Sequence, residues 1–302
     1  MGLPLGLVLP MLERPVEGIA PTWTDMLAIT RAAEECGADT VWLGDEILWT
    51  DPDWPGSRGW WDCLTLAGAL AAVTTTVRIG SWVMSALQHK PGMVVRAAET
   101  VDEISGGRFV LGLGAGHAGG ATEMGFATDH KVARYLEALE IIVPLLRGTE
   151  PVSFEGEYYR GENLMVRPRG PRPGGIPLMM GGHATKTMTA AVRHADIWSA
   201  FATTSSRPDA FRDMTHRLDQ ICQEVGRDPA SIERSVGAIV EVGTGGTAEE
   251  LGFGVPITGS IDQITETVAG FRDVGVTRVE IMPWPPTLDS VEQLEPLFAH
   301  LK

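Results

Sequence analysis

Short apolar runs alternate with longer amphipathic runs along this chain, and this alternation constrains the fold more than any other feature. The apolar runs have the length and composition of strands and cover residues 3–9, 39–45, 77–84, 108–114, 176–182, 196–201, 232–242 and 276–282. Helical patterns follow these runs at 22–38, 61–76, 91–105, 129–148, 184–195, 207–226, 260–275 and 288–301. Such an alternation within 302 residues predicts a (β/α)8 TIM barrel rather than an open, doubly wound sheet.

The segment 149–175 interrupts the alternation. Its sequence VSFEGEYYRGENLMVRPRGPRPGG, at 152–175, is typical of a β-hairpin followed by a loop rich in proline and glycine. No linker divides the rest of the chain. We therefore expect one domain over residues 1–302, with this hairpin and loop inserted into the barrel.

Composition excludes several classes of partner. A formal net charge of −15 disfavours binding to nucleic acid, which requires a basic surface. No apolar run reaches the roughly 18–20 residues that span a bilayer, so we expect no membrane anchor. Cys36, Cys63 and Cys222 are far apart and odd in number, which disfavours a disulfide framework or a zinc site. These features are typical of a cytoplasmic protein, and we predict no metal.

The glycines of GGRFVLGLGAGHAGG, at 106–120, match the pattern G-x-G-x-x-G between Gly114 and Gly119. A dinucleotide-binding turn belongs to the first strand–helix unit and precedes a second strand that ends in an acidic residue. Here the glycines follow the fourth predicted strand, and the chain about 20 residues later is in the middle of a long helix. The motif is therefore interpreted as a barrel loop whose backbone lets a ligand approach closely.

Several longer motifs carry a family resemblance. The runs AAETVDEISGGRFVLGLGAG at 97–116, RYLEALEIIVPLLRG at 134–148 and RGWWDCLTLAGALAAVTTTVRIG at 58–80, together with FEGEYYR at 154–160 and ADIW at 195–198, resemble the bacterial luciferase-like monooxygenase superfamily. The resemblance covers residues 1–285. It implies a TIM barrel with an insertion, a homodimer, and a dissociable hydride carrier, either the deazaflavin F420 or FMN, that reacts with a small organic substrate.

The resemblance also places the cofactor. GSWVM, at 80–84, resembles the strand whose end carries a non-proline cis peptide bond against the cofactor ring, here between Trp82 and Val83. GGH, at 181–183, resembles the phosphate site, and glycines that open a helix present free N–H groups to an anion. The predicted cofactor-binding residues are Ser81, Trp82, Val83, Ser85, Gly114, Gly116, Gly181, Gly182, His183 and Lys186.

The expected catalytic residues depart from the family's pattern. LGDEILW, at 43–49, resembles an Asp-His pair, but Glu46 stands where histidine is common. A carboxyl group replaces an imidazole in proton transfer only if burial raises its pKa. Glu46 therefore either transfers a proton or only orders the pocket, and Asp45 is expected to hydrogen-bond a ring edge or neighbouring backbone rather than act as a base. His117 stands in a loop that lacks the usual carboxylate, either as a hydrogen-bond donor or as a solvent-facing residue.

Two further groups leave alternatives open. Arg167, Arg169 and Arg172 either meet an anionic cofactor tail or lie in a solvated loop. The tryptophans of the loop after the second strand, with Trp284, either wall a pocket or form a dimer surface; these are Trp49, Trp54, Trp60 and Trp61.

The resemblance of the LGDE and GGH regions favours an F420-dependent oxidoreductase. The alternatives are an FMN-dependent monooxygenase served by a separate flavin reductase, and a barrel that binds a flavin or another ligand without catalysis.

Overall fold

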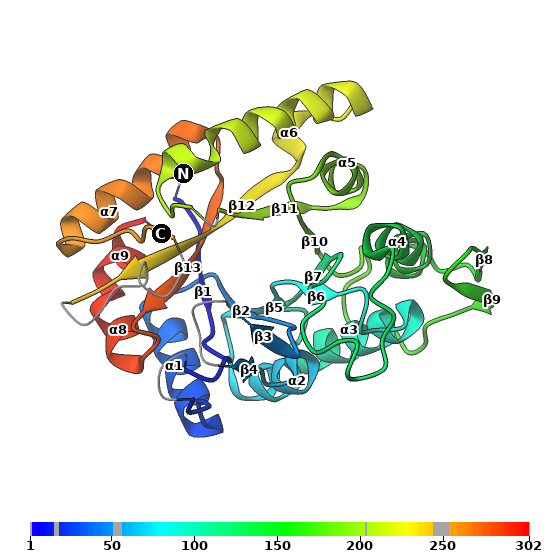
Figure 1. Ribbon diagram of the computed structural model, residues 1–302, viewed down its shortest axis with the longest axis horizontal. Coiled ribbons are helices and arrows are strands. Elements are labelled where there is room, and N and C mark those ends of the chain that lie inside the picture. Colours follow the sequence, from blue (N-terminus) through cyan, green and yellow to red (C-terminus); the bar gives the residue numbers. More distant parts are fainter. Residues whose placement is uncertain (1, 15–17, 51–55, 203, 244–253, 302) are drawn as a thin grey trace.

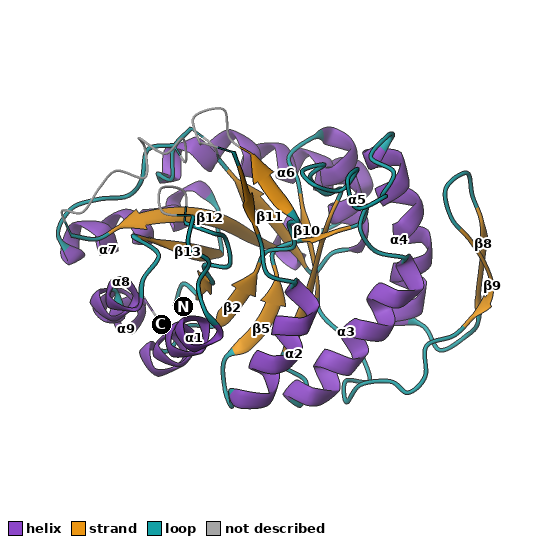
Figure 2. Ribbon diagram, turned by 60° about the horizontal axis from the view of Figure 1, so that its bottom comes forward, coloured by secondary structure: helices purple, strands orange, loops and turns teal. Residues whose placement is uncertain are grey.

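The computed structural model describes residues 2–14, 18–50, 56–202, 204–243 and 254–301. A closed ring of eight parallel strands lies at its centre (Figures 1 and 2). These strands are β1 Leu5–Val8, β2 Thr40–Leu43, β5 Arg78–Ser81, β7 Phe109–Gly114, β10 Leu178–Gly181, β11 Ile197–Phe201, β12 Glu233–Glu241 and β13 Arg278–Trp284. The ring closes because β1 pairs with both β2 and β13, and because β10 pairs with both β7 and β11. The predicted (β/α)8 barrel is confirmed.

Helices surround this ring on its outside (Figure 2). They are α1 Trp23–Cys36, α2 Cys63–Val73, α3 Pro91–Ser105, α4 Lys131–Arg147, α5 Thr185–His194, α6 Arg212–Val225, α7 Ile261–Ala269, α8 Leu288–Gln293 and α9 Glu295–Leu301. Local signals explain their ends. Thr22 and Asp25 form a capping box at the start of α1, and Gly37, with φ of 84°, ends this helix.

Three details differ from the sequence-based expectation. The strand predicted at 77–84 is divided into β5 and a short β6, Met84–Ser85. Trp82 and Val83 separate the two parts. The helix predicted at 288–301 is divided into α8 and α9 at Leu294. A small antiparallel hairpin, β3 Leu48–Thr50 with β4 Ser57–Gly59, forms in the loop after β2 and was not predicted.

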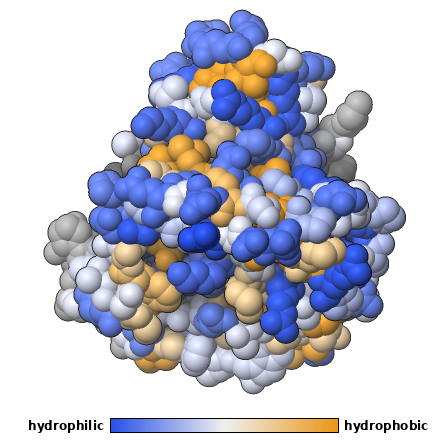
Figure 3. Space-filling model, turned by 90° about the vertical axis from the view of Figure 1, so that its right-hand side faces the viewer, coloured by the Kyte–Doolittle hydropathy of each residue, from blue (hydrophilic) through white to orange (hydrophobic). Residues whose placement is uncertain are grey.

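The hairpin predicted within 149–175 is present as β8 Val152–Glu155 and β9 Arg160–Leu164, which pair antiparallel. It stands outside the barrel beyond α4 (Figure 1). On the face that carries α3, α4 and this hairpin, small hydrophobic patches lie between hydrophilic residues (Figure 3). Exposed apolar side chains on or next to these elements include Met93, Ile104 and Met165. The homodimer remains a prediction.

The amino-terminal end of the barrel interior is filled by ion pairs. Arg278 is fully buried, and its guanidinium group contacts Asp39 at 2.9 Å and Glu280 at 2.6 Å. Glu280 also accepts hydrogen bonds from Ser235 Oγ, at 2.8 Å, and from Trp42 Nε1. Burial lowers the pKa of Arg278, but the surrounding carboxylates raise it by a larger amount. The net shift is upward, so this side chain stays charged. A ligand must therefore enter at the opposite end, where the strands have their carboxyl ends.

No helix in the described part of the chain is long and apolar enough to cross a membrane.

Candidate active site

Asp45 follows β2 and ties the ends of two neighbouring strands together. Its buried carboxylate accepts a hydrogen bond from the backbone N–H of Ser85, at 2.9 Å, and contacts Nε2 of His89 at 2.8 Å. Burial lowers the pKa of His89, but the carboxylate of Asp45 raises it by more, and the net shift is upward. Asp45 therefore hydrogen-bonds neighbouring backbone, as expected. It also pairs with His89, which was not predicted from the sequence.

Glu46 is the most perturbed carboxyl group of this end of the barrel. Its side chain is 23% exposed. Burial, together with the neighbouring charge of Asp45, raises its pKa from 4.5 to about 7. Its Oε2 atom is buried and has no hydrogen-bond partner within the described residues. A carboxyl group in this state can take up or release a proton near neutral pH.

His117 lies beside Glu46, with 3.6 Å between His117 Nδ1 and Glu46 Oε2. The imidazole stacks on Trp49, with ring centroids 5.0 Å apart. The backbone N–H of Gly119 donates to His117 Nδ1, at 3.1 Å, which assigns the proton of the neutral ring to Nε2. Burial lowers the pKa of His117, which favours this neutral form. Glu46 and His117, which the motif resemblance marks as departures from the family's pattern, are thus neighbours in space.

The peptide bond between Trp82 and Val83 is cis, as the resemblance predicted. The side chain of Val83 packs against the apolar cluster of the barrel interior and lies close to glycines at the ends of β7 and β10. A Cβ atom at Gly114 would be 2.7 Å from Val83 Cγ2, and one at Gly181 would be 3.3 Å from it. Trp82 Nε1 donates to Ser199 Oγ at 2.8 Å. The two glycines therefore leave room for Val83 between β7 and β10.

Ser81 and Ser85 differ although both were predicted to bind the cofactor. Ser81 is fully buried, and its hydroxyl bonds both the N–H and the C=O of Gly112, at 2.8 and 3.0 Å, so it joins β5 to β7. Ser85 Oγ is buried and unpartnered within the described residues. A Cβ atom at Gly116, where φ is 79°, would clash with Ser85 Oγ. Ser85 is therefore the better placed of the two to bond a ligand.

The predicted phosphate site opens α5. Gly182 has φ of 122°, and Ala184 caps the helix without a side-chain hydrogen bond. Arg217, on α6, reaches this helix start: it donates to Thr185 Oγ1, and its Nη1 lies 3.5 Å from the carbonyl oxygen of His183. The sequence analysis missed Arg217 because nothing in the pattern of α6 relates it to α5.

Lys186, which was expected to add charge at the phosphate site, lines a groove between α4 and α5 together with Glu140 and Arg193. Lys186 shares one face of α5 with Thr189 and Arg193, three and seven residues later, and this face lies toward α4.

Two of the three arginines for which a cofactor tail and a solvated loop were left open as alternatives have structural partners instead. Arg169 pairs with Glu99 at 2.9 Å, and Arg172 pairs with the buried Asp102. These ion pairs connect the proline-rich loop to α3. Arg167 lines a groove beside the inserted hairpin and stays a candidate.

Unpartnered polar atoms gather at this end of the barrel. Seven buried side-chain nitrogen or oxygen atoms of the described residues have no hydrogen-bond partner, and five of them belong to the segment 46–88. These five are Glu46 Oε2, Trp49 Nε1, Trp60 Nε1, Ser85 Oγ and Gln88 Nε2. Buried polar atoms normally have partners, so this set indicates a place for a polar ligand. These donor and acceptor atoms fit the polar ring system of a flavin or deazaflavin.

Within the described residues, no group of three or more His, Cys, Asp or Glu side chains is arranged to hold a metal ion.

Trp54 and Trp61 are two of the tryptophans for which a pocket wall and a dimer surface were left open as alternatives. Trp54 lies outside the described residues. Trp61 is 46% exposed and donates its indole N–H to the carbonyl of Pro21 at 2.8 Å.

The family model described as luciferase-like monooxygenase matches residues 4–251. The chain belongs to this family. The family predicted from the sequence motifs is thereby confirmed.

Individual members of the luciferase-like family resemble the chain over part of their length. The 5,10-methylenetetrahydromethanopterin reductase of Archaeoglobus fulgidus is 28% identical over 65% of the chain and 54% of the relative. The pyrimidine monooxygenase RutA of Klebsiella pneumoniae is 31% identical over 58% of the chain and 50% of the relative. The chain thus spans about half the length of the curated relatives it matches.

A solved structure, of an F420-dependent secondary alcohol dehydrogenase in complex with an F420-acetone adduct, superimposes with a TM-score of 0.82 and 15% identity and covers 100% of both chains. At this identity the likeness shows the fold alone.

Proposed function

We propose that this luciferase-like protein is an oxidoreductase that transfers hydride between F420 and a small organic substrate. The observation that carries the proposal is Glu46, a largely buried carboxyl group with a pKa of about 7 and a buried, unpartnered oxygen at the mouth of the barrel. Support comes from relatives that are a reductase and a monooxygenase.

A hydride transfer that interconverts an alcohol and a carbonyl group moves one hydride at carbon and one proton at oxygen. When bound, F420 would supply the carrier of the hydride. Glu46 would hold the proton at Oε2, taking it from the substrate hydroxyl in one direction and returning it in the other. Its raised pKa suits both directions near neutral pH.

The neighbours of Glu46 would hold and orient the reactants. Asp45 and His89 fix the backbone at Ser85, whose free hydroxyl would bond the cofactor. Val83 would support the cofactor's ring from the barrel side. The start of α5, with Arg217 close by, would bind its phosphate through free N–H groups and positive charge. His117 would donate a hydrogen bond from Nε2 to the cofactor or the substrate.

An FMN-dependent monooxygenase that relies on a separate flavin reductase is the second candidate, and the pyrimidine monooxygenase among the relatives favours it. The two candidates differ in the cofactor that binds more tightly.

Titration of the purified protein with F420 and with FMN, followed by fluorescence quenching, separates the candidates. We expect F420 to bind more tightly than FMN. In Glu46→Gln we expect F420 binding within about twofold of wild type, but turnover with a panel of alcohols and ketones lowered about 10²- to 10⁴-fold. The control Glu150→Gln, at an exposed carboxylate, should leave both unchanged.

Tighter binding of FMN than of F420 would support the FMN-dependent monooxygenase instead. Failure of both cofactors to bind at micromolar concentration would contradict the cofactor site, and full turnover by Glu46→Gln would remove this residue from the mechanism.

A further inference from the structure

An apolar cavity of about 140 Å³ lies at the carboxyl ends of β1, β12 and β13. The residues that line it include Val8, Trp60, Ile239, Met282, Trp284 and Pro286. Val8 also packs in the apolar cluster of the barrel interior that Trp82 and Val83 touch. The cavity therefore shares the barrel mouth with the candidate cofactor site, but on the opposite side from β5 and β7.

Trp60 joins this cavity to the loop of the candidate catalytic residues. Its indole ring lies against Gly44, where a Cβ atom would be 3.0 Å from the ring, and Asp45 and Glu46 follow directly. Trp60 Nε1 is buried and has no hydrogen-bond partner within the described residues. A buried N–H group beside an apolar cavity can be satisfied by a ligand oxygen.

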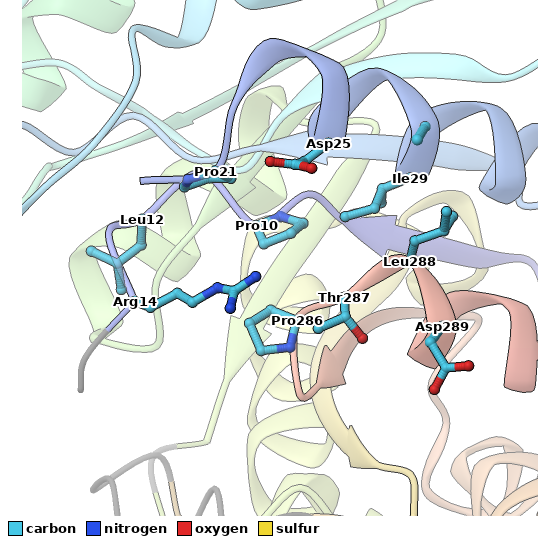
Figure 4. A pocket seen from close by; sticks show the side chains of 11 residues that line it. Pro10, Leu12, Arg14, Pro21, Asp25, Ile29, Pro286, Thr287, Leu288 and Asp289 are labelled. Carbon is cyan, nitrogen blue, oxygen red and sulfur yellow. The ribbon is translucent and has the colours of Figure 1, made fainter. Parts of the chain in front are cut away.

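Charge is sparse around the cavity. Arg14 is the charged residue among the described residues that line it. A neighbouring pocket of about 290 Å³ shares Arg14 with the cavity, and there the guanidinium group extends toward Pro286 (Figure 4). One exposed arginine is a poor site for a phosphate group, which proteins hold with several charged or N–H donors at once.

We propose that this cavity binds the hydrocarbon part of the substrate and that Trp60 Nε1 donates a hydrogen bond to the substrate's oxygen. The substrate class is then a small, uncharged alcohol or its carbonyl counterpart, not a sugar phosphate. This inference rests on the proposed function. In the alcohol, the C–H bond at the carbinol carbon would break to supply the hydride that F420 carries when bound, the hydroxyl proton would pass to Glu46, and a C=O bond would form.

Binding of cyclohexanone to the full-length protein tests the inference without turnover, and we would measure it by ligand-detected NMR in the absence and presence of saturating F420. Wild type should bind cyclohexanone and show no competition by glucose 6-phosphate. Met282→Arg, which places a charge in the cavity, should weaken cyclohexanone binding at least about tenfold. F420 binding should stay within about twofold.

Two tryptophan variants sharpen the test. Trp60→Phe keeps an aromatic ring but removes the N–H donor, so it should weaken cyclohexanone binding about fivefold and leave methylenecyclohexane, which lacks the oxygen, unchanged. The matched control Trp61→Phe, whose indole N–H donates to Pro21 instead, should leave both ligands unchanged.

The outcomes separate the inference from the proposed function. Absence of cyclohexanone binding with and without F420, or binding that neither Met282→Arg nor Trp60→Phe weakens, would overturn the inference. Tighter binding of glucose 6-phosphate than of cyclohexanone would also overturn it. If cyclohexanone binds as expected while F420 does not bind at all, the proposed function fails and the apolar cavity remains a binding site.

Discussion

The raised pKa of Glu46 has a consequence for stability that needs no cofactor and no substrate. An unfolded chain ionises this glutamate at about 4.5, whereas the folded protein keeps it protonated up to about 7. Between these two values the native state binds a proton that the unfolded state has lost. Stability therefore falls as the pH rises through this window, and the loss is complete above the folded pKa.

The size of the effect follows from the two pKa values. A rise from 4.5 to about 7 corresponds to about 3 kcal/mol of native-state destabilisation once the group is ionised. Glutamine at this position has nearly the same shape and cannot ionise. We therefore expect Glu46→Gln to have nearly wild-type stability at about pH 4.5 and to be up to about 3 kcal/mol more stable than wild type at about pH 8.

Urea unfolding followed by tryptophan fluorescence measures this difference at several pH values between about 5 and 8. Subtracting the wild-type curve from that of Glu46→Gln cancels the titration of groups that do not interact with Glu46. The control Glu150→Gln should show no pH-dependent difference, because that carboxylate is exposed. A constant difference between Glu46→Gln and wild type across this range would refute the argument that burial and Asp45 hold Glu46 protonated.

The barrel interior and the glycine-rich loop supply two further predictions. Glu280→Ala leaves the fully buried guanidinium of Arg278 without its nearest carboxylate and should lower the free energy of unfolding by about 3–5 kcal/mol in a urea titration; a loss below about 1 kcal/mol would contradict the assigned role. Gly116→Ala should weaken F420 binding at least about tenfold in a fluorescence titration, because its Cβ clashes with Ser85 Oγ and its φ of 79° is strained for alanine. Gly92→Ala, where a Cβ meets nothing within 4 Å, is the control and should bind F420 as wild type does.

Patterns that lie close together in the sequence could be predicted. Alternating apolar and amphipathic runs located the strands and helices, because each strand fills the barrel wall and each helix covers it with one face. Motif resemblance located the cis bond at Trp82–Val83 and identified Glu46 as the unusual residue of its loop. The small hairpin β3–β4 was not predicted, because its strands are only three residues long.

Contacts between distant segments could not be predicted. His89 meets Asp45 across 44 positions of sequence, and Arg217 reaches the start of α5 from α6. No local sequence pattern around His89 or Arg217 indicates which residue each of them contacts. Lys186 was chosen because it is close in sequence to the glycines, but its side chain lines the groove toward α4.

The barrel, the inserted hairpin and the strand ends that carry the candidate residues could be derived from local sequence patterns, because periodicity and turn residues act over a few positions. Which of those residues share one environment depends on how the folded chain brings distant segments together. Burial and the charge of Asp45 raise the pKa of Glu46, and the packing of the loop after β7 on the loop after β2 places His117 beside it. Desolvation and Coulomb interactions depend on distance in space, and closing the barrel is what sets those distances.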